Sequence, residues 1–281
     1  MDTRRRSRRQ GAALSDPLAD ATAAVVEARG VTKRYASGTI ALARVDVSVR
    51  AGELIALLGP SGCGKTTLLN LLAGLLAPTT GEIRWWGASQ LPAVEPNRRL
   101  GYVFQTPTLM PWARVAANIR LPLDLAHVDR TQADAAVSDA LEWVGLERFG
   151  NAFPRELSGG MQMRASIARA LVTQPSLLLM DEPFGALDEF TRQRLDDELL
   201  ALWRKRGLTI AFVTHSIVEA VYLATRIVVM GARPGRVLET IAVDAPARRG
   251  DAWRMSPGFA ELCRRVASRV NEAGAAALDA G

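Results

Sequence analysis

The residues with the clearest chemical signature form one short segment, residues 59–67. Its first eight positions match the pattern G-x-x-x-x-G-K-[ST], in which glycines let a tight turn aim backbone N–H groups at phosphate oxygens. Lys65 can bind the β- and γ-phosphates, and the Thr66 hydroxyl can bind Mg²⁺. The segment consists of Gly59, Pro60, Ser61, Gly62, Cys63, Gly64, Lys65, Thr66 and Thr67. It predicts a site for a nucleoside triphosphate and magnesium.

The flanks of this segment distinguish a phosphate-binding loop from an ordinary glycine-rich turn. An apolar run at residues 54–58 precedes it, and helical spacing follows from Lys65 to Leu75. A helix that starts at such a loop directs its positive end toward the phosphates. This context favours the phosphate-binding interpretation over the structural one.

Three further polar residues follow apolar runs of the kind that form buried strands. Asp181 and Glu182 end the run 177–180, and His215 follows the run 209–213 closely. Because α/β sheets bind ligands at the carboxyl ends of their strands, these side chains are expected beside the triphosphate. Asp181 can hold Mg²⁺ or its water, and Glu182 can accept a proton from an attacking water. Alone, such acids are often simply solvated and such a histidine structural; the phosphate loop favours the catalytic interpretation.

The remaining patterns indicate an α/β fold that positions these residues. Residues 1–24 are rich in Arg, Ala and Asp and are expected to be a disordered tail. Strand patterns begin at Val25, and apolar strands alternate with a helix between residues 177 and 230. The predicted folded body spans residues 25–245, followed by a C-terminal helix and flexible tail at 246–281.

A mostly helical lobe is predicted at about residues 107–172. Thr131 with Asp134 resembles a helix-capping pair, and apolar residues at helical spacing follow. Three prolines are expected to break up the segment after Gln105: Pro107, Pro111 and Pro122. The lobe also holds His127, to which no role is assigned.

Composition excludes several classes of protein. The 281 residues carry a net charge of +6, but five arginines lie in the first nine residues, so a nucleic-acid partner is not expected. No run approaches the roughly 18 apolar residues that span a bilayer. Cys63 and Cys263 are far apart, which implies no disulfide framework. The Cys63 thiol, near a helix start, is expected to have a lowered pKa.

A second motif indicates which kind of triphosphate-binding protein this is. Leu157-Ser158-Gly159-Gly160-Met161 resembles the LSGGQ signature of ATP-binding cassettes, and Ser158 lies 23 residues before Asp181. Across about residues 25–245 the motifs resemble this family in order and spacing. The resemblance implies a P-loop NTPase fold with a RecA-like core sheet, an N-terminal antiparallel β portion and a helical signature subdomain. It also implies an ATPase that uses ATP and Mg²⁺.

The resemblance assigns roles within one cassette. Tyr35 matches the aromatic residue that stacks on adenine, and Gln105 the glutamine that contacts Mg²⁺ and senses the γ-phosphate. Glu182 matches the catalytic base and His215 the switch histidine, and Lys65 joins them in the catalytic set.

Other matches concern a second cassette. Ser158, Gly159 and Gly160 match signature positions that contact the ATP held by the other copy, and Asp188 matches the aspartate that links the two sites. Ser158 is also a good N-cap for its own helix, which is compatible with that role. Met161 departs from the family pattern, which has glutamine there.

Closer resemblance points to the nitrate, sulfonate and taurine importer branch, through Ser158 to Met161, Pro111-Trp112 and residues 188–191. It implies a homodimer on the cytoplasmic face of the membrane, with two permease subunits and a solute-binding protein. Leu109 and Trp112 are expected either to line a groove for a permease helix or to be lobe core. Import of a vitamin-precursor pyrimidine is the alternative function.

Three rival classes fit less well. A soluble cassette ATPase of nucleic-acid maintenance requires a coiled-coil insertion, and no heptad stretch occurs here. A translation factor carries two cassettes in one chain. A P-loop kinase leaves the Ser158 motif unexplained.

Overall fold

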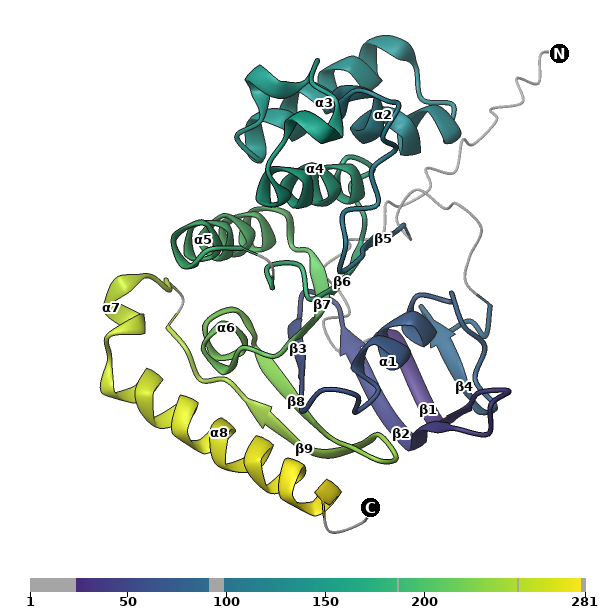
Figure 1. Ribbon diagram of the computed structural model, residues 1–281, viewed down its shortest axis with the longest axis vertical. Helices are drawn as coiled ribbons and strands as arrows, with labels where there is room; N and C mark the ends of the chain where they lie inside the picture. Colours follow the sequence, from purple (N-terminus) through teal and green to yellow (C-terminus); the bar gives the residue numbers. More distant parts are fainter. Residues whose placement is uncertain (1–23, 91–98, 186, 247, 279–281) are drawn as a thin grey trace, which may run out of the picture.

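The computed structural model describes residues 24–90, 99–185, 187–246 and 248–278 (Figure 1). The Arg-rich segment, apart from Ala24, lies outside the described residues. The strands are β1 (Ala24–Arg34), β2 (Ile40–Arg50), β3 (Leu54–Leu58), β4 (Thr80–Trp85), β5 (Leu100–Val103), β6 (Leu177–Asp181), β7 (Thr209–Thr214), β8 (Arg226–Gly231) and β9 (Arg236–Ala242). The helices are α1 (Lys65–Leu72), α2 (Val115–Leu125), α3 (Arg130–Trp143), α4 (Gly159–Leu171), α5 (Glu189–Arg206), α6 (Ile217–Leu223), α7 (Asp251–Arg254) and α8 (Pro257–Leu278).

Two sheets form the body of the molecule. The smaller has the order β2-β1-β4 and is antiparallel, as predicted for the N-terminal portion. The larger, which we call the core sheet, has the order β5-β6-β7-β3-β8-β9. Its strands are parallel except β9, which runs antiparallel to β8. The predicted α/β class with an antiparallel portion is confirmed.

The apolar runs explain the core sheet. Every residue of β3, β6 and β7 is buried, as expected for parallel strands covered on both faces. Alternate residues of β3 serve two separate clusters: Leu54, Ala56 and Leu58 face α5, α6 and α8, whereas Ile55 and Leu57 face α1 and the antiparallel sheet. Helix α1 packs between the two sheets, so the segment before it is held on both sides.

Helices α2, α3 and α4 form a lobe at one end of the molecule, with its own apolar cluster (Figure 1). Two local predictions fail here. Pro122 lies inside α2 rather than interrupting it, because buried Val115, Ile119 and Leu123 hold the helix against the lobe core despite the missing backbone donor. The cap of α3 is Asp129, not Thr131, because the Asp129 carboxylate accepts from the Thr131 and Gln132 N–H groups.

The C-terminal part packs on the same core. Phe259 and Val266 of α8 are buried in the cluster that contains β3 residues, and α8 contacts α6, β8 and β9. Arg249 donates to the last carbonyls of α6, at Tyr222, Leu223 and Ala224. No helix among the described residues is long and apolar enough to cross a membrane.

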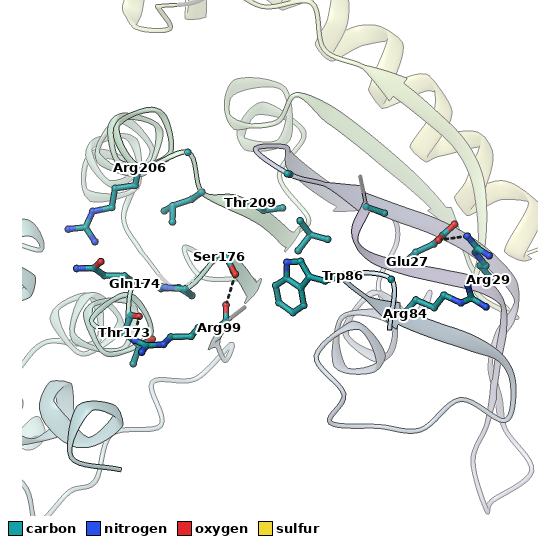
Figure 2. A pocket seen from close by; sticks show the side chains of 17 residues that line it. Glu27, Arg29, Arg84, Trp86, Arg99, Thr173, Gln174, Ser176, Arg206 and Thr209 are labelled. Carbon is teal, nitrogen blue, oxygen red and sulfur yellow. Dashed lines mark hydrogen bonds and ion pairs between the residues drawn. The ribbon is translucent and has the colours of Figure 1, made fainter. Parts of the chain in front are cut away.

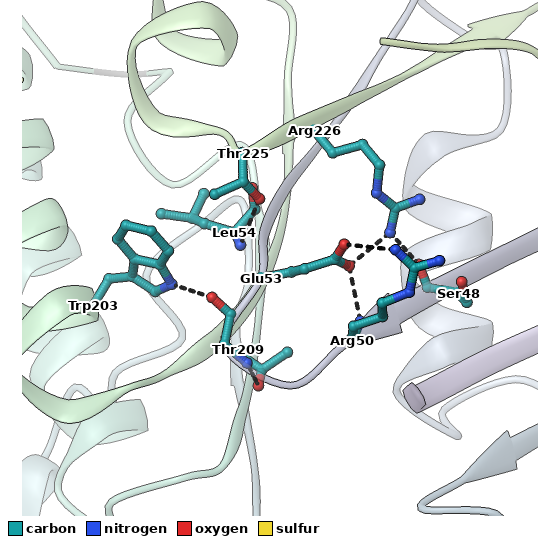
Figure 3. Close-up of polar contacts among 9 residues, drawn as sticks. Ser48, Arg50, Glu53, Leu54, Trp203, Thr209, Thr225 and Arg226 are labelled. Atoms are coloured by element: carbon teal, nitrogen blue, oxygen red, sulfur yellow. Dashed lines mark hydrogen bonds and ion pairs between the residues drawn. The ribbon is translucent and has the colours of Figure 1, made fainter. Parts of the chain in front are cut away.

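A polar junction fixes the amino end of β3 (Figure 3). The Glu53 carboxylate accepts from the Arg50 backbone N–H at 2.8 Å and from Arg226 Nη2 at 2.7 Å. The Trp203 indole donates to the Gly52 carbonyl at 2.9 Å. These bonds connect β3 to β8 and α5 and set the start of the strand whose other end leads into the glycine-rich loop.

Candidate active site

The glycine-rich loop and the predicted acid–base residues lie along one edge of the core sheet. Strands β5, β6, β7 and β3 are neighbours and parallel, so their carboxyl ends meet there. The loop follows β3, Gln105 follows β5, Glu182 follows β6 and His215 follows β7. The structure therefore brings residues from four separate parts of the chain together.

The loop geometry requires glycine at two positions. Gly64, the N-cap of α1, has φ +89°, and a Cβ there would lie 2.9 Å from the Ala41 carbonyl oxygen. A Cβ on Gly59 would lie 2.4 Å from the Met230 carbonyl oxygen. The loop is thus pressed against neighbouring backbone while α1 starts from it, which leaves the backbone N–H groups of the first turn available to an anion.

Lys65 lies at the centre of the loop and is only 6% exposed. Its ammonium donates to the Gly59 carbonyl at 2.9 Å and to the Pro60 carbonyl at 3.0 Å. A buried ammonium satisfied by neutral carbonyls can exchange them for phosphate oxygens at little cost, because phosphate gives stronger, charge-assisted bonds.

The expected lowering of the Cys63 pKa is wrong. The side chain is fully buried, and burial raises the pKa of its thiol, opposed by the nearby Lys65 charge. Proximity to a helix start alone does not lower the pKa when the sulfur is desolvated.

Thr66 and Asp181 form a pair of oxygen donors. The Thr66 hydroxyl donates to Asp181 Oδ1 at 3.1 Å, and Asp181 is 5% exposed. Burial raises the pKa of Asp181; the Thr66 bond opposes the rise and the Glu182 charge adds to it. Hydroxyl and carboxylate oxygens fit Mg²⁺, which takes one or two protein ligands together with phosphate and water. A cation bound there would favour the ionised carboxylate.

The Glu182 carboxylate lies between Gln105 and His215. Its Oε2 accepts from Gln105 Nε2 at 3.2 Å and lies 3.4 Å from His215 Nδ1. The backbone of Glu182 is left-handed, with φ +46°, and its N–H donates to the Val213 carbonyl at 3.0 Å. A bulky residue in this conformation stores strain at a functional position. The arrangement suits a carboxylate that accepts a proton from a water held by an amide and an imidazole.

Tyr35 lies beside α1. Its hydroxyl is 3.2 Å from Thr67 Oγ1, and the residue is 39% exposed. The Lys33 ammonium lies 5.7 Å from the ring centroid. The ring is therefore held near the loop with part of its surface open to a planar ligand.

The signature residues lie apart from the loop of their own copy. Ser158 Oγ accepts from the Met161 N–H at 3.3 Å, so Ser158 caps α4. Nothing lies within 4 Å of a Cβ placed on Gly159, and one on Gly160 would lie 3.0 Å from Leu187. Among the hydrogen bonds of the described residues, none joins Ser158, Gly159 or Gly160 to residues 59–67.

Asp188 caps α5. Its carboxylate accepts from the Thr191 N–H at 3.0 Å and from the Thr191 hydroxyl at 2.7 Å. These bonds hold the pKa of Asp188 below its usual range, the hydroxyl bond most strongly. Asp188 is therefore an anion at the start of a helix, and the preceding residue, Leu187, lies against Gly160 at the start of α4.

Sequence reasoning missed Thr214 and Glu219, which are 2% and 5% exposed. The Thr214 hydroxyl donates to the Glu219 carboxylate just beside His215. The available signal was Ser216-Ile217-Val218-Glu219, a capping-box pattern directly after His215.

A cleft of about 1070 Å³ lies at the opposite edge of the core sheet, near the amino ends of β6 and β7 (Figure 2). Trp86 faces it, and Arg84, Arg99 and Arg206 line it. Its lining acid, Glu27, pairs with Arg29 at 2.8 Å. The cleft lacks the loop and the acid–base group, so size alone does not locate the active site.

A P-loop strand–helix unit, an acid pair at the end of the next strand but one in the same sheet, and a capped glycine helix start on a separate lobe define an ATPase of the cassette class. Comparison with known proteins agrees. Residues 42–185 match the family model described as ABC transporter. The chain belongs to this family and is an ATP-binding ATPase.

The relatives include importers. The taurine import ATP-binding protein TauB of Rhizobium johnstonii is 44% identical over 238 residues, which cover 83% of this chain and 90% of that protein. TauB of Pseudomonas entomophila is 40% identical over 253 residues, 88% and 96% of the two chains. The ATP-binding cassette MJ0796, in a dimeric post-hydrolysis structure bound to ADP and Pi, is 31% identical, with TM-score 0.71 and coverage of 79% and 100%.

Proposed function

We propose that this ATPase powers import of a small anion, such as taurine, another sulfonate or nitrate, through a separate membrane permease. The observation that carries the proposal is the convergence of Lys65, the Thr66–Asp181 pair and Glu182 at one sheet edge, in a chain 44% identical to a taurine import ATPase. The chain is then a peripheral subunit at the cytoplasmic face of the membrane.

Each residue of the edge has a role in hydrolysis. Lys65 and the loop N–H groups bind the phosphates, and Tyr35 stacks on adenine. Thr66, Asp181 and Gln105 would hold Mg²⁺, which would neutralise part of the phosphate charge. Glu182 accepts a proton from the attacking water, and His215, beside it, reaches the γ-phosphate. Within this set, Thr66 contacts Asp181 at 3.1 Å, and Glu182 contacts Gln105 at 3.2 Å and His215 at 3.4 Å.

The partner cassette is a second copy of this chain. Ser158, Gly159 and Gly160 begin a helix whose backbone is approachable, yet they do not bind the loop of their own copy. A helix start of this kind suits the γ-phosphate of an ATP held by another molecule. Asp188, anionic and adjacent to that helix start, links the two sites. The cassette MJ0796 is dimeric with ADP and Pi bound, which supports the pairing of two cassettes.

The permease docks on the lobe beside Trp112. This side chain is 77% exposed, so of the two interpretations of Trp112 the lobe-core one does not fit. Leu109 is partly buried against the lobe cluster and supports the surface from beneath. An exposed tryptophan on a packed lobe is a suitable anchor for a short permease helix.

Reconstitution tests the transport role. The chain is co-purified with a candidate permease and solute-binding protein, placed in vesicles, and assayed for ATP-dependent uptake of labelled taurine, nitrate and a pyrimidine. We expect uptake of taurine or nitrate, with ATPase activity stimulated by the loaded binding protein and reduced by Trp112→Ala. Uptake of the pyrimidine alone, or ATPase activity indifferent to the permease, would overturn the proposal.

A further inference from the structure

A closed set of hydrogen bonds surrounds His215 without including it. The Thr214 hydroxyl donates to Glu219 Oε2 and accepts from the Ser216 N–H at 3.0 Å. The Ser216 hydroxyl in turn accepts from the Glu219 N–H at 3.2 Å. The residues on both sides of His215 are therefore fixed to the first turn of α6, while the imidazole itself stays 59% exposed.

This set departs from the ordinary capping box. In that motif the acid at the third helical position bonds the N–H of the capping serine directly. Here the Ser216 N–H goes to the Thr214 hydroxyl, and the Glu219 carboxylate turns inward to bind that hydroxyl. The Glu219 carboxylate thus connects the end of β7 to α6 from a buried position instead of capping the helix at the surface. Removing this carboxylate from water costs free energy of folding.

The same loop also positions the catalytic base. Val213, the residue before Thr214, accepts the Glu182 N–H at 3.0 Å and so holds the left-handed backbone of Glu182. Burial raises the pKa of Glu219 to about 7, and the Glu182 charge is among the causes of the rise, which places the two carboxylates within electrostatic reach. A shift of the 213–216 loop would therefore move both groups.

We propose that Glu219 is a positioning residue: through the Thr214 hydroxyl, its buried carboxylate fixes the loop that aims His215 and Glu182 at the γ-phosphate. The inference rests on the proposed roles of His215 and Glu182. The hydrogen bonds of Glu219 go to Thr214 and Ser216 rather than to His215 or Glu182, so it acts through the loop.

The test uses two variants in the full chain, Thr214→Val and Glu219→Met. Each removes one side of the hydroxyl–carboxylate bond, and Met fills the space of Glu without its buried charge. We expect kcat for ATP hydrolysis to fall roughly tenfold to a hundredfold in both, with KM and the affinity for fluorescent ATP changed less than about twofold. Glu219→Gln, which keeps an acceptor oxygen, should recover most of kcat.

Thr209→Val is the matched control. Thr209 is also a buried threonine of β7, at its other end, and its hydroxyl accepts the Gly52 N–H at 3.0 Å. It should lose stability comparable to Thr214→Val with kcat unchanged. A double-mutant cycle of Thr214→Val with Glu219→Met should show strongly non-additive effects on kcat, because the two side chains share one bond.

A second readout does not depend on activity. The side-chain resonances of His215, measured by NMR without nucleotide, should shift in Thr214→Val and Glu219→Met and not in Thr209→Val. Unshifted resonances and kcat retained within about twofold in Glu219→Met would overturn the inference. An unchanged kcat in Glu182→Gln, measured alongside, would instead remove the proposed base.

Discussion

Two glutamates at opposite ends of the core sheet have almost the same burial and very different partners. The Glu53 side chain is 18% exposed and that of Glu182 22%. Glu53 binds the Arg226 guanidinium and a backbone N–H at 2.7–2.8 Å. Glu182 has a neutral amide at 3.2 Å and an imidazole at 3.4 Å.

The difference separates structural from catalytic charge. Short bonds to a backbone N–H and to a permanent cation hold Glu53 Oε2 in one place, and the Arg50 guanidinium lies 3.8 Å from Oε1. Longer contacts from Gln105 and His215 to Oε2 hold the Glu182 side chain in position. The carboxylate still has the capacity to accept a hydrogen bond from a water. Burial alone therefore does not distinguish the proposed catalytic base from a structural glutamate, but the charge of the partners and the lengths of the contacts do.

The largest expected effect comes from Glu182→Gln. We expect kcat to fall by about 10²–10⁴, because the proton acceptor is lost. ATP affinity should be retained, and ATP should then hold two copies together, detected by sedimentation or light scattering. The melting temperature should stay near that of the wild type, since the amide keeps the neutral contacts.

Asp196→Asn tests whether the catalytic side of the molecule carries destabilising charge. Asp196 is 4% exposed in α5, and burial raises its pKa to about 9, with the Glu219 charge adding to the rise. Between pH about 4 and 9 the folded state keeps a proton that the unfolded chain releases, so stability falls as pH rises. The charged groups that also act on it are Glu219, Asp197, Arg192 and Arg254.

Asp196→Asn removes this contribution to the pH dependence of stability. The stability of the variant relative to the wild type, from urea unfolding at pH 6, 7 and 8, should increase by up to about 1.4 kcal/mol per pH unit. Parallel curves for the two proteins would show that Asp196 is ionised in the folded state.

Glu53→Gln should give the opposite outcome to Glu182→Gln. Arg226, 19% exposed, loses its counter-charge, and we expect a loss of roughly 1–3 kcal/mol in the free energy of unfolding. The kcat of the folded protein should stay within about twofold of the wild type. Glu27→Gln is the control and should cost less stability, since its partner Arg29 is 51% exposed.

The smallest effect is expected from Trp203→Phe. The change removes the indole bond to the Gly52 carbonyl but keeps the aromatic packing, so about 1 kcal/mol of stability should be lost. Calorimetry should show a melting temperature lower by a few degrees, with kcat unchanged. A clear loss of kcat would mean that contacts at the amino ends of the core strands affect the residues at their carboxyl ends. The distinction drawn between Glu53 and Glu182 would then be wrong.

The sequence allowed prediction where the signal is local. The 59–67 loop needs glycines at close approach and a strand and helix on its flanks, all written in consecutive residues. The Ser158 cap is local too, because it bonds an N–H three residues later. The parallel core followed from continuous apolar runs, whereas the antiparallel N-terminal portion was implied by the resemblance to ATP-binding cassettes.

Tertiary packing decided the rest. Helix α2 continues through Pro122 because lobe residues that are distant in the sequence bury the apolar face of the helix. The pKa of Cys63 rises because the folded protein removes its sulfur from water. From the sequence, Glu219 is expected to cap α6 at the surface. In the structure α5 packs against α6, and Glu219 is buried. Sequence spacing contains no information on that burial.

The borders of the core sheet limit how copies of this chain can associate. At one border, β5 has only four residues. At the other, β9 carries Glu239, which is paired with Arg265 and Arg269 of α8. Short or charged borders resist the intermolecular strand pairing that leads to aggregation. Pairing of two copies through either of these border strands is therefore disfavoured, which protects the core sheet from aggregation at high protein concentration.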